Sequence, residues 1–241
     1  MILYATLALC AVFTAVVVYK YDLYDREPWP LLFLCAALGA VAMTAAGRVE
    51  SLAFRSWPRL GDGAIAFVAA AVEELGKLLV VTAIALLARR QFNDPLDGLI
   101  YGSVAGLGAA LEESVGVLRG AAHAPLLLPG SEVVRISGHL VMGGIGAFGL
   151  GALRLKRPWA WGWLLSSFAA AGALHFLWDW LSLSPAPEQQ AVQALRASAL
   201  MLGGLVVWRR LVTIGLSWSQ PVFAPGPSRA GAIVEDREAA R

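Results

Sequence analysis

The chain has 241 residues, of which 58% are hydrophobic and 15% are charged, and its formal net charge is +2. A soluble domain carries about 25% charged residues, so this composition excludes an ordinary soluble protein. A net charge this close to zero gives no basis for binding nucleic acid. The two cysteines, Cys10 and Cys35, stand in apolar runs without the spacing of metal ligands, and we interpret them as small hydrophobic residues.

Seven apolar segments are long enough to cross a membrane as helices, which takes about 17–25 residues each. The first has neither the basic start nor the cleavage site of a signal peptide, so we count it as a retained span. The pattern predicts an all-α, polytopic helical membrane protein with about seven transmembrane helices. We expect one membrane domain over residues 1–214 and a flexible cytoplasmic tail over residues 215–241. In chain order, the predicted spans cover residues 2–19, 30–47, 64–88, 97–118, 136–153, 158–181 and 191–213.

The distribution of basic residues predicts the orientation of the spans. Twelve Lys and Arg residues follow spans one, three, five and seven, whereas five follow spans two and four. Because cytoplasmic loops carry the excess of Lys and Arg, we expect the N-terminus outside and the C-terminus in the cytoplasm of a cell membrane. Trp159, Trp161 and Trp163 come directly after the basic turn RLKRP, and they are typical of the aromatic belt at a membrane boundary.

The predicted spans also contain ionisable residues, and these point to a site. Such a residue costs at least about 2.5 kcal/mol at the centre of a bilayer, so it normally faces the protein interior. With the orientation above, carboxylates and imidazoles from four helices fall in the outer leaflet, which indicates that they converge. The ionisable residues are Glu73, Glu74 and Lys77 in span three, Glu112 and Glu113 in span four, His139 in span five, His175 and Asp179 in span six, and Arg196 in span seven.

Their spacing suggests local pairs. Lys77 is i+4 from Glu73 and i+3 from Glu74, and His175 and Asp179 share one helix face. Glu73 and Glu74 point about 100° apart, so one can hold Lys77 while the other reaches water or a metal. The residues alone leave three interpretations open, namely a buried ion-pair network that locks the helices, a hydrolytic site, and a proton or ion pathway.

Several stretches taken together resemble the PrsW family of intramembrane proteases, relatives of the CAAX-processing and bacteriocin-processing membrane proteases. They are EELGK, FNDPLDGLIYGSVAGLGAALEES, GHLVMGGIGAFGLG and HFLWDW, with YDREPWP before them, and the resemblance covers roughly residues 20–181. It implies that the catalytic residues are Glu73, Glu74, His139 and His175. It also implies that Asp179 is the companion of His175, with Lys77 and Glu113 in support. The chain departs from the family pattern at Ser114, where Asn is usual, and at Ala109, where Phe is usual.

The resemblance also implies an activity, an endopeptidase that cuts a single-pass membrane protein, such as a membrane-anchored anti-sigma factor, in a bacterial plasma membrane. No HExxH, GxSG or GxGD motif of other membrane proteases is present. We expect water activated by Glu73 or Glu74 to attack the peptide carbonyl, with Asp179 orienting His175. His139, His175 and one of the two glutamates then bind a divalent metal, for which we expect zinc. Alternatively, the histidines donate to the oxyanion without metal, or the site belongs to an ion- or proton-coupled carrier or channel.

The remaining polar and glycine residues are expected to be structural. We expect Asp97 to be a helix N-cap, His123 to lie in a solvated loop, and Arg196 to extend outward to the membrane surface. Glycines at small-residue spacing are expected to let helices approach closely. These glycines are Gly102, Gly106, Gly143, Gly144 and Gly151.

Overall fold

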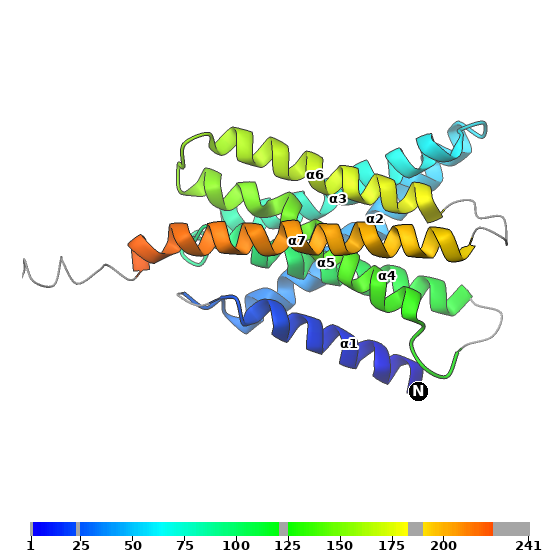
Figure 1. Ribbon diagram of the computed structural model, residues 1–241, viewed down its shortest axis with the longest axis horizontal. Coiled ribbons are helices and arrows are strands. Elements are labelled where there is room, and N and C mark those ends of the chain that lie inside the picture. Colours follow the sequence, from blue (N-terminus) through cyan, green and yellow to red (C-terminus); the bar gives the residue numbers. More distant parts are fainter. Residues whose placement is uncertain (1, 23–24, 121–124, 183–189, 224–241) are drawn as a thin grey trace, which may run out of the picture.

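The computed structural model describes residues 2–22, 25–120, 125–182 and 190–223. The regular structure within these ranges is entirely helical, and the helices run roughly along the long axis of the molecule (Figure 1). This confirms the predicted all-α architecture. The helices are α1 (Ile2–Tyr19), α2 (Trp29–Ser56), α3 (Asp62–Leu87), α4 (Asp97–Gly120), α5 (Gly130–Arg154), α6 (Ala160–Ser182) and α7 (Gln190–Phe223).

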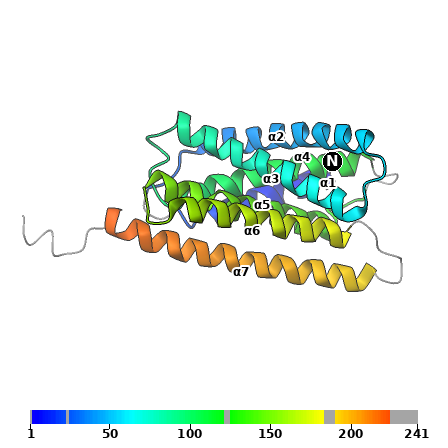
Figure 2. The same cartoon turned by 90° about the horizontal axis from the view of Figure 1, so that it is seen from above.

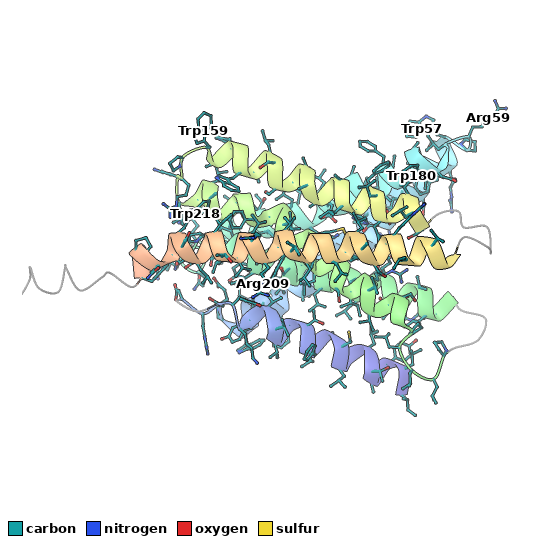
Figure 3. The ribbon with its side chains drawn as sticks, viewed as in Figure 1. Trp57, Arg59, Trp159, Trp180, Arg209 and Trp218 are labelled. Atoms are coloured by element: carbon teal, nitrogen blue, oxygen red, sulfur yellow. The ribbon has the colours of Figure 1, made fainter. Side chains whose placement is uncertain are left out.

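Five of these helices are long and apolar enough to cross a membrane, namely α1, α2, α5, α6 and residues 195–221 of α7. The other two, α3 and α4, carry ionisable residues within the helix, namely Glu73, Glu74 and Lys77 on α3 and Glu112 and Glu113 on α4. Exposed tryptophans stand at both ends of the bundle, with Trp57 and Trp180 toward one end and Trp159 at the other (Figure 3). Aromatic residues gather at both interfaces of a membrane. The chain is therefore a multi-pass membrane protein.

Three helices extend beyond the predicted spans. Helix α2 continues from residue 47 to Ser56, α5 begins at Gly130 instead of residue 136, and α7 continues to Phe223. Hydropathy marks where a segment leaves the apolar phase, whereas proline or other backbone breakers decide where a helix ends. Pro58 follows the end of α2, and Pro129 directly precedes α5.

Part of the predicted tail is docked on the bundle. Residues 215–223 are helical, and the Trp218 ring lies 5.6 Å from that of Phe148 and 5.5 Å from that of Trp163. Ser219 Oγ donates a 2.7 Å hydrogen bond to Asp94 Oδ1. Trp163 thus belongs to an aromatic cluster, while Trp159 and Trp161 are exposed as an aromatic belt requires. The expected flexible part over residues 224–241 lies outside the described residues, as does His123.

Helices α4 and α5 form the buried centre, between α2 and α7, which lie on opposite sides in Figure 2. Glycines allow the backbones of α4 and α5 to approach each other closely. A Cβ atom at Gly102 would lie 2.2 Å from the Gly143 carbonyl oxygen, and one at Gly106 would lie 2.0 Å from the His139 carbonyl oxygen. Such backbone-to-backbone approach is what small residues permit between membrane helices. The packing role predicted for the glycines is confirmed, and Gly106 places the backbone of His139 directly against α4.

The N-terminus of α4 differs from the prediction. The Asp97 carboxylate accepts hydrogen bonds from the backbone N–H groups of Asn93 and Asp94, which precede it. Asp94 Oδ1 accepts the N–H of Leu96, as a capping residue does. The expectation that Asp97 caps the helix was therefore wrong. The backbone N–H groups of the turn before α4 also need acceptors, and the Asp97 carboxylate lies beside them.

Candidate active site

The predicted site residues come together from four helices. Glu73, Glu74 and Lys77 lie near the middle of α3, Glu113 near the C-terminal end of α4, His139 on α5, and His175 and Asp179 on α6. Each makes a polar or charged contact with at least one other member of this group. The convergence of charged and imidazole side chains from separate spans, which the sequence predicted, is confirmed for the described residues.

Glu74 holds two polar partners through one carboxylate oxygen. Its side chain is 1% exposed, and Oε1 accepts from Lys77 Nζ at 2.5 Å and lies 2.8 Å from His175 Nδ1. Lys77 is also buried, so the pair compensates its own charge. Because a carboxylate accepts hydrogen bonds, this contact requires the proton of His175 on Nδ1. The other ring nitrogen, Nε2, is then free to accept a hydrogen bond or bind a metal.

Glu73 faces the two imidazoles. Its Oε2 atom lies 3.5 Å from His175 Nε2 and 3.8 Å from His139 Nδ1, and the ring centroids of the two histidines are 5.2 Å apart. Both Glu73 Oε2 and His139 Nδ1 are buried without a hydrogen-bond partner. An orphaned buried polar atom costs about 1–3 kcal/mol, so two of them facing one point indicate a missing partner.

These three residues fit a metal ion. One ligand atom from each of Glu73, His139 and His175 lies within 4.8 Å of the others. Two ligands bound about 2.0–2.1 Å from a tetrahedral zinc are roughly 3.4 Å apart, close to the separations from Glu73 to the two imidazoles. Two neutral imidazoles and one carboxylate are also a donor set that zinc takes in hydrolytic enzymes.

Two further carboxylates, those of Glu113 and Asp179, lie at the edge of the site. Glu113 Oε2 lies 3.0 Å from His139 Nε2, and its other oxygen lies 3.2 Å from Arg135 Nε. Asp179 Oδ2 lies 3.5 Å from His175 Nε2. The Glu113 and Asp179 side chains are 34% and 24% exposed, so this side of the site is open to the surface of the bundle.

Comparison with known proteins gives a family. The model of the PrsW family, described as intramembrane metalloproteases, matches residues 27–208, well over half of the chain. The chain belongs to the PrsW family. No curated protein and no solved structure was found to match it. As a PrsW-family member the chain is a membrane-embedded protease, and the family description implies a metal, for which Glu73, His139 and His175 provide a suitable set.

The geometry separates the roles of two residues within this PrsW-family site. The sequence suggested that Asp179 orients His175, but Glu74 occupies the Nδ1 side of the ring, and Asp179 lies toward Nε2. At 3.5 Å this contact is beyond the usual range of a hydrogen bond. Asp179 therefore lies on the Nε2 side of the imidazole, and the carboxylate within hydrogen-bond distance of the ring is that of Glu74.

Sequence reasoning missed Glu50. It lies on the part of α2 that extends past the predicted span, and its side chain interacts electrostatically with Asp179, His175 and Glu113. Its Oε1 atom is buried without a hydrogen-bond partner. Glu112, next to Glu113, faces away from the site, since Thr44 on α2 donates a 3.1 Å hydrogen bond to it. The missed signal was that RVESLAFRS contains no helix breaker and so continues the helix.

A second polar cluster at the opposite end of the bundle explains the YDREPWP motif. Glu27 is buried and accepts a hydrogen bond from the Tyr101 hydroxyl on α4, and its own N–H donates to Asp22 Oδ2 at 2.6 Å. Burial raises the pKa of Asp22 to about 6, and burial also raises the pKa of Glu27 above its ordinary value. This cluster fixes the start of α2 against α4, on whose far end Glu113 lies.

Proposed function

We propose that this protein hydrolyses a peptide bond of a single-pass membrane protein, within or close to the outer leaflet, by means of the site on α3, α4, α5 and α6. The observation that carries the proposal is that Glu73 Oε2 and His139 Nδ1 are buried without partners beside His175 Nε2. An ion-pair network that only locked helices would have its polar atoms paired, as Lys77 Nζ and Glu74 Oε1 are.

Glu73, His139 and His175 would hold the metal, and zinc is the metal we propose. When bound there, it polarises a carbonyl and lowers the pKa of a bound water. Glu74 holds His175 in the tautomer that presents Nε2, and Lys77 keeps Glu74 charged. Carboxylates behind metal-binding histidines orient the ring and raise its basicity.

Hydrolysis adds the oxygen of water to the carbonyl carbon and breaks the C–N bond, so one proton must leave the water and reach the leaving amine. Glu74 is engaged by Lys77 and His175, and Glu113 is engaged by His139. Asp179 and Glu50 remain, and of these two only Asp179 lies within 4.0 Å of a site histidine, so we assign to Asp179 the acceptance of that proton and its return to the amine. This assigns to Asp179 the role that the sequence suggested for Glu73 or Glu74.

The distribution of basic residues supports the orientation, and the resemblance to the PrsW family supports the substrate. With the basic loops in the cytoplasm, the site end of the bundle faces outward. The substrate we propose is a single-span protein of the anti-sigma-factor kind, as the resemblance implies. Some of the counted residues lie inside helices, and without them nine basic residues still stand against one. The residues inside helices are Arg154, Arg209 and Arg210 on the basic side, and Arg48, Arg55, Arg119 and Arg135 on the other. A reporter active only in the cytoplasm should work when fused after Arg157 or after the C-terminus, and should be silent when fused within 125–129. The reverse pattern would place the site in the cytoplasmic leaflet.

The deciding experiment uses purified protein in liposomes with a single-span substrate, together with metal analysis. Wild type should cut the substrate and contain metal. Glu73→Gln and His139→Ala should lose both metal and cleavage, whereas Asp179→Asn should keep the metal and lose cleavage. Glu112→Gln is the matched control, because this neighbouring carboxylate faces Thr44 of α2 instead of the site.

The competing function, a proton or ion carrier, makes a different prediction in the same liposomes. A carrier would dissipate an imposed proton gradient, and Glu73→Gln would stop that leak. Wild type that leaks protons but cuts no substrate would refute the protease proposal. Cleavage that survives exhaustive chelation of metal-free protein would refute the role of the metal and favour the histidines as oxyanion donors.

A further inference from the structure

An apolar groove lies between α3 and α6, which pack against each other and lie side by side in Figure 1. The groove encloses a cavity of about 460 Å³. Its walls are small residues with phenylalanines beside them, and its one ionisable residue is Glu74. The lining residues are Phe67, Ala70, Ala71 and Glu74 on α3, and Phe168, Ala169, Gly172, Ala173 and Phe176 on α6.

The groove is continuous with the site. Glu74 lines it, and the Oε1 atom of the same side chain contacts His175, which directly precedes the groove residue Phe176. The Phe176 ring stacks on Trp180 with centroids 6.2 Å apart, so this wall is held in place. Trp180 itself stands toward the end of α6 (Figure 3). The groove therefore leads from the apolar surface of the bundle to Glu74, the carboxylate that contacts His175 from its Nδ1 side.

We propose that this groove binds a short extended stretch of the substrate's own membrane span, three or four residues with small or aliphatic side chains, next to the bond that is cut. This inference rests on the proposed protease function and adds the substrate-binding surface and its preference. The stripe from Phe67 to Glu74 is about 10 Å long at about 1.5 Å per residue, which matches three extended residues at about 3.3 Å each.

The chemistry of the groove favours a peptide with this conformation. In a helix the peptide carbonyl is already hydrogen-bonded within the segment, so a carbonyl must leave the helix before water can attack it. Non-helical backbone at membrane depth is tolerated where protein buries it. A groove that is apolar along its length and ends at Glu74 gives an unwound segment such a place, with its apolar side chains on the walls and its end next to His175.

Gly172 offers a direct test. A Cβ atom there would meet nothing within 4 Å, so a larger side chain fits the fold but fills the groove. Gly203 on α7 is the matched control, since its Cβ also meets nothing within 4 Å and it does not line this groove. Gly172→Trp should reduce cleavage of a single-span substrate at least tenfold, while metal content and thermal stability stay at wild-type values. Gly203→Trp should cut at the wild-type rate.

A photo-crosslinking residue identifies the occupant. Placed at Ala173 in the Glu73→Gln background, it should crosslink to the substrate residues beside the scissile bond, whereas the same group at exposed Leu202 on α7 should not. Crosslinks from Ala173 to lipid alone, or Gly172→Trp cutting at the wild-type rate, would overturn the inference while leaving the protease function intact. Wild type that cuts no membrane substrate would instead overturn the function on which the inference rests.

Discussion

Replacing Gly106 by alanine should reduce the activity of the enzyme by displacing the backbone that carries His139. The new Cβ atom would lie 2.0 Å from the His139 carbonyl oxygen, where real Cβ contacts essentially never fall below 3.0 Å. The backbones of α4 and α5 must therefore separate by about 1 Å or more at His139. Overpacking of this kind costs about 1–3 kcal/mol, and the higher helix propensity of alanine returns about 1 kcal/mol.

A second variant on the same helix, Gly116→Ala, separates the cost of overpacking from the gain in helix propensity. A Cβ there meets nothing within 4 Å, so Gly116→Ala should gain only the propensity term of up to about 1 kcal/mol. The two variants should differ in unfolding free energy by about 1–3 kcal/mol, measured by denaturant titration in detergent. A misplacement of about 1 Å at a reacting group can cost about 100-fold in rate, so Gly106→Ala should also lose most cleavage and bind metal more weakly. Equal stability and full activity in both variants would show that α4 does not position His139.

Three further perturbations test the charges and the metal. Lys77→Met should destabilise the protein by about 3–5 kcal/mol because it leaves the buried Glu74 carboxylate unpaired, and adding Glu74→Gln should restore most of the unfolding free energy without restoring cleavage. The wild-type melting temperature in detergent should fall as pH rises through about 6. The reason is that the fold raises the pKa of Asp22 and of Glu27, so the folded protein holds protons that the unfolded chain releases at lower pH. Glu27→Gln should flatten that dependence, and a melting temperature that rises over this range would contradict it. Zinc at about 100 times its dissociation constant should stabilise the metal-free protein by about 2.7 kcal/mol, and no shift in melting temperature would count against a metal bound by the folded state.

The convergence of the site could be predicted from the sequence because charge is expensive inside a membrane. Each buried carboxylate or imidazole in a span needs a partner, and His139 and Glu113 could find theirs only on other spans. The same argument predicted that adjacent Glu73 and Glu74 would have different partners. It could not say which of them would hold Lys77, because both spacings to the lysine are favourable on a helix.

Other features depend on tertiary structure that no local pattern records. Glu50 joins the site only because α2 continues through a polar segment, and the hydropathy of that segment indicates a loop. Glu27 finds Tyr101 across 74 positions of sequence. Asp97 has the composition of a helix cap, yet its carboxylate accepts from the turn before it. In each case the partner is decided by helix packing after the secondary structure is fixed.

The site holds more acidic than basic side chains, and this excess of negative charge favours a bound metal ion. Among the described residues, five carboxyl groups gather here against two basic side chains, one of which, Arg135, also pairs with Glu132. Like charges within a low-dielectric interior repel one another, and an unpaired buried carboxylate is costly. A divalent cation between Glu73 and the histidines would lie at the centre of this excess, and it would satisfy the two atoms that the protein leaves without partners. The acidic groups are Glu50, Glu73, Glu74, Glu113 and Asp179, and the basic ones are Lys77 and Arg135. The surplus of carboxylates, which would weaken a purely structural network, is what a cation-binding hydrolytic site requires.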